Sequence, residues 1–160
     1  MSDRPRDEAR ALVGRLYDTY GAALYRYAAM LLADPAAAED AVQQVFAAIL
    51  RRPPEMEQEA HYLRRAVRNE CYSHLRRRQT DVAHVAARSL IEPTADGVAE
   101  DDRLALERAI RDLSPEQREV VHLHVFEGMT FQEIANATDV SINTISARYR
   151  YALARLRQLL

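Results

Sequence analysis

Apolar residues recur at helical spacing through the first half of the chain. Between Glu8 and Leu32 they fall three or four positions apart, which is the period of one face of an α-helix. Asp34-Pro35 is typical of a helix start, because an aspartate caps free amides and a proline suits the first turn. Pro53-Pro54 ends the helix that follows. We therefore predict helices over residues 8–32, 35–51 and 57–78.

The second half of the chain carries stronger start and stop signals. Ser114-Pro115-Glu116-Gln117 combines a capping serine, a first-turn proline and a glutamine three positions after the serine, which is a capping box. Thr130 and Glu133 repeat the pattern, and Gly128 before them is typical of a helix end. Ser141 precedes a last amphipathic stretch. The signals predict helices over residues 103–113, 115–126, 130–138 and 141–159.

Between the two halves the helical pattern weakens. Residues 92–102 contain five acidic side chains and no basic one. Such a segment favours a solvated connection over a packed element. We predict an all-α fold of two small helical domains, residues 8–79 and 103–160. An acidic flexible linker over residues 80–102, with a short helical piece around 82–90, joins them.

Composition excludes several classes of protein. A single cysteine, Cys71, allows no internal disulfide framework, and the polar N-terminus does not resemble a signal peptide. No apolar run is long enough to span a membrane, so we expect a cytoplasmic protein. No phosphate-binding loop, nucleophile motif or metalloprotease motif occurs, which predicts a protein that is not an enzyme and needs no cofactor. Cys71 and His74 share a helix face, but a structural zinc needs four ligands, so we predict no metal site.

The segment from Thr130 to Tyr151 predicts a helix-turn-helix. It reads TFQEIANATDVSINTISARYRY, two capped helices separated by a very short turn. Ala135 provides the small side chain needed where the helices approach closely. Asp139 stands in the turn, where a positive φ is often required and aspartate is tolerated.

The last helix has the charge expected of a DNA-reading helix. Residues 141–160 contain four arginines and no acidic residue, a local charge of +4. Such a helix can lie in the major groove with its N-terminal residues at the base edges. The alternative to a DNA-binding helix is an ordinary amphipathic helix whose arginines are solvated. The helix caps and the short turn before this helix favour DNA binding. The candidate contacts are Asn143, Thr144, Ser146, Ala147, Arg148 and Arg150.

Both halves resemble the sigma-70 family of RNA polymerase sigma factors, in its extracytoplasmic-function (ECF) group. The stretch LSPEQREVVHLHVFEGMTFQEIANATDVSINTISARYRYALARLR resembles region 4 of that family. Two stretches resemble region 2: LYDTYGAALYRYAAMLLADPAAAEDAVQQVFAAIL and YLRRAVRNECYSHLRRR. Together they cover nearly the whole chain in the family's order and spacing.

The resemblance implies a promoter-specificity subunit that binds core RNA polymerase and promoter DNA. Region 4 would read the −35 element, and region 2 would recognise and melt the −10 element. The helix around AEDAVQQVF would dock on polymerase. For Phe46 within it, core packing is the favoured alternative. The resemblance also implies an anti-sigma factor as a controlling partner. The implied polymerase contacts are Asp40, Gln43, Gln44 and Phe46.

Charge supports the assignment of region 2. Residues 61–79 contain six arginines and one glutamate, a local charge of +5, with tyrosines interleaved. Aromatic rings can stack on unpaired bases while arginines follow the phosphates. Core packing is an open alternative for both tyrosines. The predicted contacts to the melted strand are Tyr62, Arg64, Arg65, Arg68, Asn69, Tyr72, Arg76 and Arg77.

The sequence departs from the family pattern at four positions. Tyr62 stands where tryptophan is usual, Ser73 where aspartate is frequent and Asp139 where glycine is common, and Ser146 often has a basic counterpart.

Two other functions remain as alternatives. One is a stand-alone regulator that binds operator DNA without polymerase, and the other is an adaptor that uses both units for protein contacts.

Overall fold

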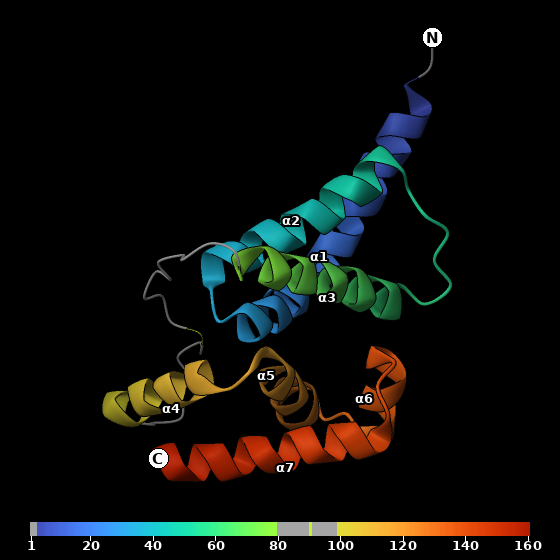
Figure 1. The fold of residues 1–160 in the computed structure, drawn as a ribbon. Coiled ribbons are helices and arrows are strands. Elements are labelled where there is room, and N and C mark those ends of the chain that lie inside the picture. The colour runs from blue at the N-terminus through green and yellow to red at the C-terminus, as the bar shows by residue number, and fades with distance from the viewer. Residues whose placement is uncertain (1–2, 80–89, 91–98) are drawn as a thin grey trace.

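The computed structural model describes residues 3–79, 90 and 99–160, and every regular element among them is helical (Figure 1). The all-α prediction is therefore confirmed. The first three helices form an N-terminal unit and the others form a C-terminal unit beneath it in the view of Figure 1. The elements are α1 (Arg4–Leu32), α2 (Pro35–Arg51), α3 (Glu59–Arg78), α4 (Glu100–Asp112), α5 (Pro115–Val121), a π-helical turn η1 (His122–Phe126), α6 (Phe131–Thr138) and α7 (Ile142–Leu159).

The N-terminal unit follows the predicted elements closely. α1 begins four residues before the predicted start, at Arg4, because Pro5 fits its first turn. Asp34 caps α2 as predicted: its Oδ1 accepts hydrogen bonds from the amides of Ala36 and Ala37 at 3.1 and 3.2 Å. α3 begins at Glu59, after the loop that contains Pro53-Pro54.

The C-terminal unit confirms both capping boxes. The side chains of Ser114 and Gln117 exchange hydrogen bonds with each other's backbone amides, and Thr130 and Glu133 do the same. Gly128 ends the preceding turn with φ +69°. A π-helical turn closes what the sequence predicted as one continuous helix to residue 126. Such turns insert an extra residue into the hydrogen-bond ladder, which the 3.6-residue period does not reveal.

The linker was predicted to extend to residue 102, but α4 already begins at Glu100. The acidic residues at positions 100–102 lie in its first turn, where the helix dipole favours negative charge. The rest of the predicted linker, including the helical piece around residues 82–90, falls almost wholly outside the described residues.

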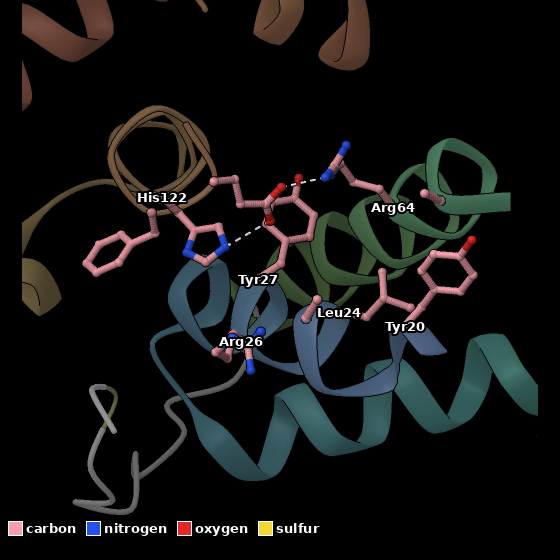
Figure 2. A pocket seen from close by; sticks show the side chains of 10 residues that line it. Tyr20, Leu24, Arg26, Tyr27, Arg64 and His122 are labelled. Carbon is pink, nitrogen blue, oxygen red and sulfur yellow. Dashed lines mark hydrogen bonds and ion pairs between the residues drawn. The ribbon is translucent and has the colours of Figure 1, made fainter. Parts of the chain in front are cut away.

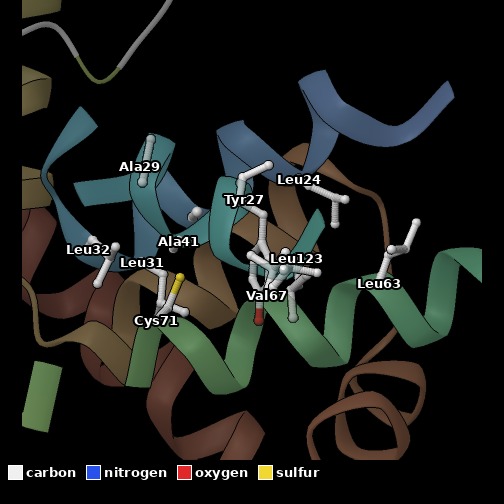
Figure 3. Close-up of a cluster of buried hydrophobic side chains, with 14 of the residues drawn as sticks. Leu24, Tyr27, Ala29, Leu31, Leu32, Ala41, Leu63, Val67, Cys71 and Leu123 are labelled. Atoms are coloured by element: carbon white, nitrogen blue, oxygen red, sulfur yellow. The ribbon is translucent and has the colours of Figure 1, made fainter. Parts of the chain in front are cut away.

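The two units share one hydrophobic core (Figure 3). Tyr27 and Leu31 of α1 and Val67 and Cys71 of α3 are at most 1% exposed, and Leu123 from the C-terminal unit packs among them. α5 lies against α1, so the C-terminal unit is docked on the N-terminal one (Figure 1). The residues predicted to bind DNA therefore lie on two units that touch each other.

Candidate nucleic-acid interface

α6 and α7 form the predicted helix-turn-helix. Ile134 and Ile145 fill the wedge between them and are fully buried, and Ala135 is buried where the helices approach. Asp139 ends α6 in the left-handed region, with φ 58° and ψ 38°. The predicted positive φ in the turn is confirmed, and it directs the chain sharply from one helix into the next.

The start of α7 is presented to solvent. Ser141 caps the helix by accepting a hydrogen bond from the amide of Thr144 at 3.2 Å. Asn143 and Thr144 are exposed, as is Arg150 one and a half turns further on. The inward face holds Tyr149, whose ring lies 4.8 Å from that of His124 and 5.3 Å from that of Phe131. The remaining predicted contacts, half-buried at the edge of this surface, are Ser146, Ala147 and Arg148.

The residues predicted on α3 to bind single-stranded DNA divide into two sets. One set is exposed along the outer side of the helix: Tyr62, Arg65, Asn69, Arg76 and Arg77. The other set is half-buried on the side that faces the C-terminal unit: Arg64, Arg68 and Tyr72. For Tyr62 the exposed fraction of 37% decides against the alternative of core packing.

Two members of the second set, Arg68 and Tyr72, are held by a buried carboxylate that sequence reasoning missed, and Arg64 pairs with Glu127. Glu119 of α5 is 1% exposed and accepts hydrogen bonds from Arg68 Nε at 2.6 Å and the Tyr72 hydroxyl at 2.8 Å. The Tyr27 hydroxyl donates to the same carboxylate at 2.5 Å. The sequence offers one signal of this site, a charged residue at an inward-facing position in the apolar pattern of α5. It does not reveal the partners of Glu119, because they lie 47 to 92 positions away along the chain.

Burial and the glutamate change the acidity of these groups. Burial, reinforced by the negative charge of Glu119, raises the pKa of Tyr27 and of Tyr72 well above that of a free phenol. Burial also raises the pKa of the Cys71 thiol to about 12. These phenols and the thiol are therefore neutral at physiological pH, and Cys71 is a buried apolar residue of α3 rather than a ligand.

The candidate polymerase-binding helix presents a polar face and buries an apolar one. Asp40, Gln43 and Gln44 are exposed on α2. Phe46 is only 6% exposed, and its ring packs edge-on against Tyr17 with centroids 5.4 Å apart. Phe46 therefore packs in the core, the alternative that the sequence favoured, and its part in polymerase binding stays a prediction of support from beneath the contact. Its aromatic ring is large and apolar, so it orients α2 from within the core.

A cavity of about 470 Å³ opens where the two units meet (Figure 2). Figure 2 shows His122 and Arg64 approaching the pocket from opposite sides, with Tyr27 and Leu24 of α1 between them. Its floor is mainly aromatic and aliphatic.

Within residues 3–79, 90 and 99–160, no cluster of three histidine, cysteine or acidic side chains could hold a metal ion. In the same part of the chain, no helix is long and apolar enough to cross a membrane.

Two family profiles match the chain, one on each unit. Residues 16–81 match "Sigma-70 region 2" and residues 109–158 match "Sigma-70, region 4". The RNA polymerase sigma-E factor of Streptomyces coelicolor is 34% identical over 141 residues, which cover 85% of this chain and 78% of that protein. The ECF RNA polymerase sigma factor SigL of Mycobacterium tuberculosis is 29% identical over 157 residues, covering 92% and 88%.

A solved structure shares the fold of both units. It is the sigma factor RpoE of Bartonella quintana in complex with the anti-sigma factor NepR. The TM-score is 0.72 at 26% identity, and the match covers 91% of this chain and 94% of that one. The match extends over both units.

Proposed function

Because this chain belongs to the sigma-70 family of RNA polymerase sigma factors, in its extracytoplasmic-function group, we propose a division of labour between its two units. The chain is a promoter-specificity subunit that binds core RNA polymerase and directs initiation at −10 and −35 promoter elements. The observation that carries this function is the presence of both regions, in family order, over most of the chain. A stand-alone operator-binding regulator would not need the N-terminal unit.

The C-terminal unit reads the upstream duplex through the first turns of α7. Asn143 and Thr144 are exposed beside the capping Ser141, and a helix enters the major groove with such N-terminal residues at the base edges. Arg148 lies one turn further along the same surface and can form a forked contact to guanine. Arg150 points further outward and holds the phosphate backbone, which positions the helix without reading sequence.

The N-terminal unit binds the melted strand through α3. Tyr62 offers an exposed ring on which an unpaired base can stack, while Arg65, Arg76 and Arg77 provide exposed positive charge for the phosphates. Asn69 supplies a polar group on the same side of the helix. Arg64, Arg68 and Tyr72 complete this surface only when the C-terminal unit has moved away from them.

α2 provides the polymerase contact. Its exposed Asp40, Gln43 and Gln44 form a polar stripe, and Phe46 fixes that stripe from beneath by packing on Tyr17. The chain acts as a regulatory subunit and performs no catalytic step itself. Its work with RNA polymerase on DNA supports a cytoplasmic location, and the sigma–anti-sigma complex of the similar RpoE supports an anti-sigma factor as its controller.

Transcription in vitro with purified core polymerase tests this assignment. We expect the chain to form a holoenzyme on a native gel and to start run-off transcripts from a subset of a promoter-fragment pool. A variant in which Gln43 and Gln44 are replaced by alanine should lose holoenzyme formation but keep its helical content. A chain that binds duplex DNA by itself yet never joins polymerase would instead be a stand-alone regulator.

A further inference from the structure

The cavity at the junction of the two units is not used by the proposed contacts with polymerase and DNA, apart from Arg64 on its rim. It holds about 470 Å³, within the roughly 300–1,000 Å³ that is typical of small-molecule sites. Its lining comes from α1, from the start of α3 and from η1 with the residue that follows it (Figure 2). Small-molecule sites occur preferentially between domains. The size and position of the cavity therefore suit a small organic ligand.

One wall of the cavity is a row of aromatic rings. The Phe126 ring stacks on that of His122, with centroids 5.8 Å apart and an interplanar angle of 25°. The His122 ring in turn lies 5.7 Å from that of Tyr27. Figure 2 shows Tyr20 on the side opposite His122, with Leu24 between them. Such walls favour a planar ring as the ligand, because aromatic groups attract one another in offset-stacked and edge-to-face arrangements.

Phe126 is the part of this wall that the protein leaves uncovered. Its side chain is 55% exposed, as is that of its neighbour Val125, but only Phe126 lines the cavity. A ligand that lies on Phe126 removes apolar surface from water, and this burial favours binding. The two neighbours thus provide a comparison between equally exposed apolar residues, one inside the cavity and one outside it.

The charges around the opening favour an anionic ligand. Glu127 already pairs with Arg64 and with His122 Nε2, the latter at 3.2 Å, so its carboxylate is occupied. Arg26 of α1 also lines the cavity and is exposed, and no carboxylate in the described part of the chain pairs with it. Two arginines and one glutamate leave one net positive charge at the opening. A carboxylate is the natural complement of a free guanidinium, because it accepts charge-assisted hydrogen bonds from it.

We propose that this cavity binds a small aromatic acid, whose ring lies against Leu24 and the aromatic wall that ends in Phe126, and whose anionic group pairs with Arg26. Because the walls belong to both units, the ligand contacts α1 and η1 together and links them. This site is separate from the proposed contacts with polymerase and DNA, and its test does not depend on them.

Ligand-observed NMR titration of the full chain tests the class of ligand. The probes are cinnamate, the neutral cinnamyl alcohol and the cationic cinnamylammonium, which share one planar ring and differ in charge. We expect cinnamate to bind with a Kd on the order of 1 mM, as suits so small a ligand. The alcohol should bind about three- to fivefold more weakly, the effect of one partly exposed ion pair, and the cation more weakly again. Equal binding of all three probes, or tighter binding of the cation, would overturn the proposal.

Substitutions locate the site. Phe126→Ala removes the exposed end of the aromatic wall and should weaken cinnamate binding about tenfold, whereas Val125→Ala should leave it unchanged. Arg26→Gln should weaken cinnamate binding about three- to fivefold and leave the binding of cinnamyl alcohol unchanged. Arg10→Gln, at an exposed position of α1 outside the cavity, is its control. Undiminished binding of cinnamate to Phe126→Ala would place the ligand elsewhere and sink the proposal.

Thermal unfolding of the wild type gives a second measurement that needs no variant. Cinnamate at about ten times its Kd should raise the folding equilibrium constant about elevenfold, because a ligand that binds only the folded chain shifts that constant by the factor 1 + [L]/Kd. Phe126→Ala should unfold near the wild-type midpoint without ligand, since its ring is half exposed, and should gain little from cinnamate. A wild-type midpoint that cinnamate does not raise would overturn the proposal whether or not the variants fold.

Discussion

At the scale of single residues, the position of an arginine along α7 determines whether it can contact a base or only the phosphate backbone. Arg148 lies at the edge of the exposed first turns, where a bidentate contact to a base is possible. Arg148→Ala should cost about 1–3 kcal/mol of binding at the upstream element, with relaxed selectivity at one base pair. Holoenzyme binding to single-base promoter variants measures this. Arg157→Ala, exposed at the far end of α7, is the control, and an equal loss on all promoter sequences would assign Arg148 to the backbone.

A buried arginine in the same unit has a structural role. Arg118 donates to the carbonyls of Met30, Leu31 and Leu113, and burial lowers its pKa to about 10, so it keeps its charge at neutral pH. Arg118→Met should lower the free energy of unfolding by about 3 kcal/mol, because buried carbonyls lose their donors. Urea unfolding measures the change. The control is Arg108→Ala at an exposed position, which should leave the urea midpoint of unfolding unchanged within error. An equally small change for Arg118→Met would show that water satisfies the three carbonyl oxygens as well as the arginine does.

Individual side chains were predictable from the sequence only where local pattern governs them. The caps at Asp34, Ser114 and Thr130 depend on neighbours within three residues, and all were predicted correctly. Phe46 and Tyr72 were ambiguous because an aromatic residue suits both a core and an interface. Only the tertiary contacts, with Tyr17 for Phe46 and with Glu119 for Tyr72, decide between them.

At the scale of elements, the turn of the helix-turn-helix is the most constrained piece of backbone. Asp139 has φ 58°, a conformation that costs most L-residues about 1–2 kcal/mol but is easier for aspartate and asparagine. It also places a negative charge at the C-terminal end of α6, where the helix dipole disfavours it. We expect Asp139→Asn to raise the free energy of unfolding by about 0.5 kcal/mol.

A β-branched residue at the same position should have the opposite effect. Asp139→Val should lower the free energy of unfolding by about 1–2 kcal/mol and weaken upstream-element binding, because the angle between α6 and α7 depends on this turn. Thermal unfolding and duplex binding by the holoenzyme check both changes. If valine were tolerated as well as asparagine, the turn would be relaxing into another conformation, and its geometry would not fix the recognition helix.

At the scale of the whole molecule, the docking of the two units is the feature that the sequence did not predict. Helical periodicity and caps are local, and they placed most helices to within a few residues. The contact between α5 and α3 depends instead on partners about 50 positions apart. The amphipathic pattern of each unit predicts the helices of that unit, but it does not show which faces of the two units pack together.

The phenols at this contact allow a test of docking by pH alone. Tyr27 and Tyr72 have pKa values raised by burial and by Glu119, whereas an unburied tyrosine ionises near pH 10. A group whose pKa is raised in the folded state stabilises that state fully below its unfolded pKa, and the contribution is lost progressively as the pH rises from that value through the higher folded pKa. Docking should therefore hold up to about pH 10 and weaken above it.

Tyrosine ionisation, followed by absorbance at alkaline pH, measures this directly because the chain has eight tyrosines and no tryptophan. We expect the exposed rings to titrate first, and Tyr27 and Tyr72 only as the units separate, seen as a delayed step that coincides with increased scattering size. Glu119→Gln should move that step toward lower pH, since it removes the charge that opposes ionisation together with the docking contact. The urea-unfolded chain should show one step. A single step near pH 10 in the native chain, with helicity intact, would mean that the units are already apart.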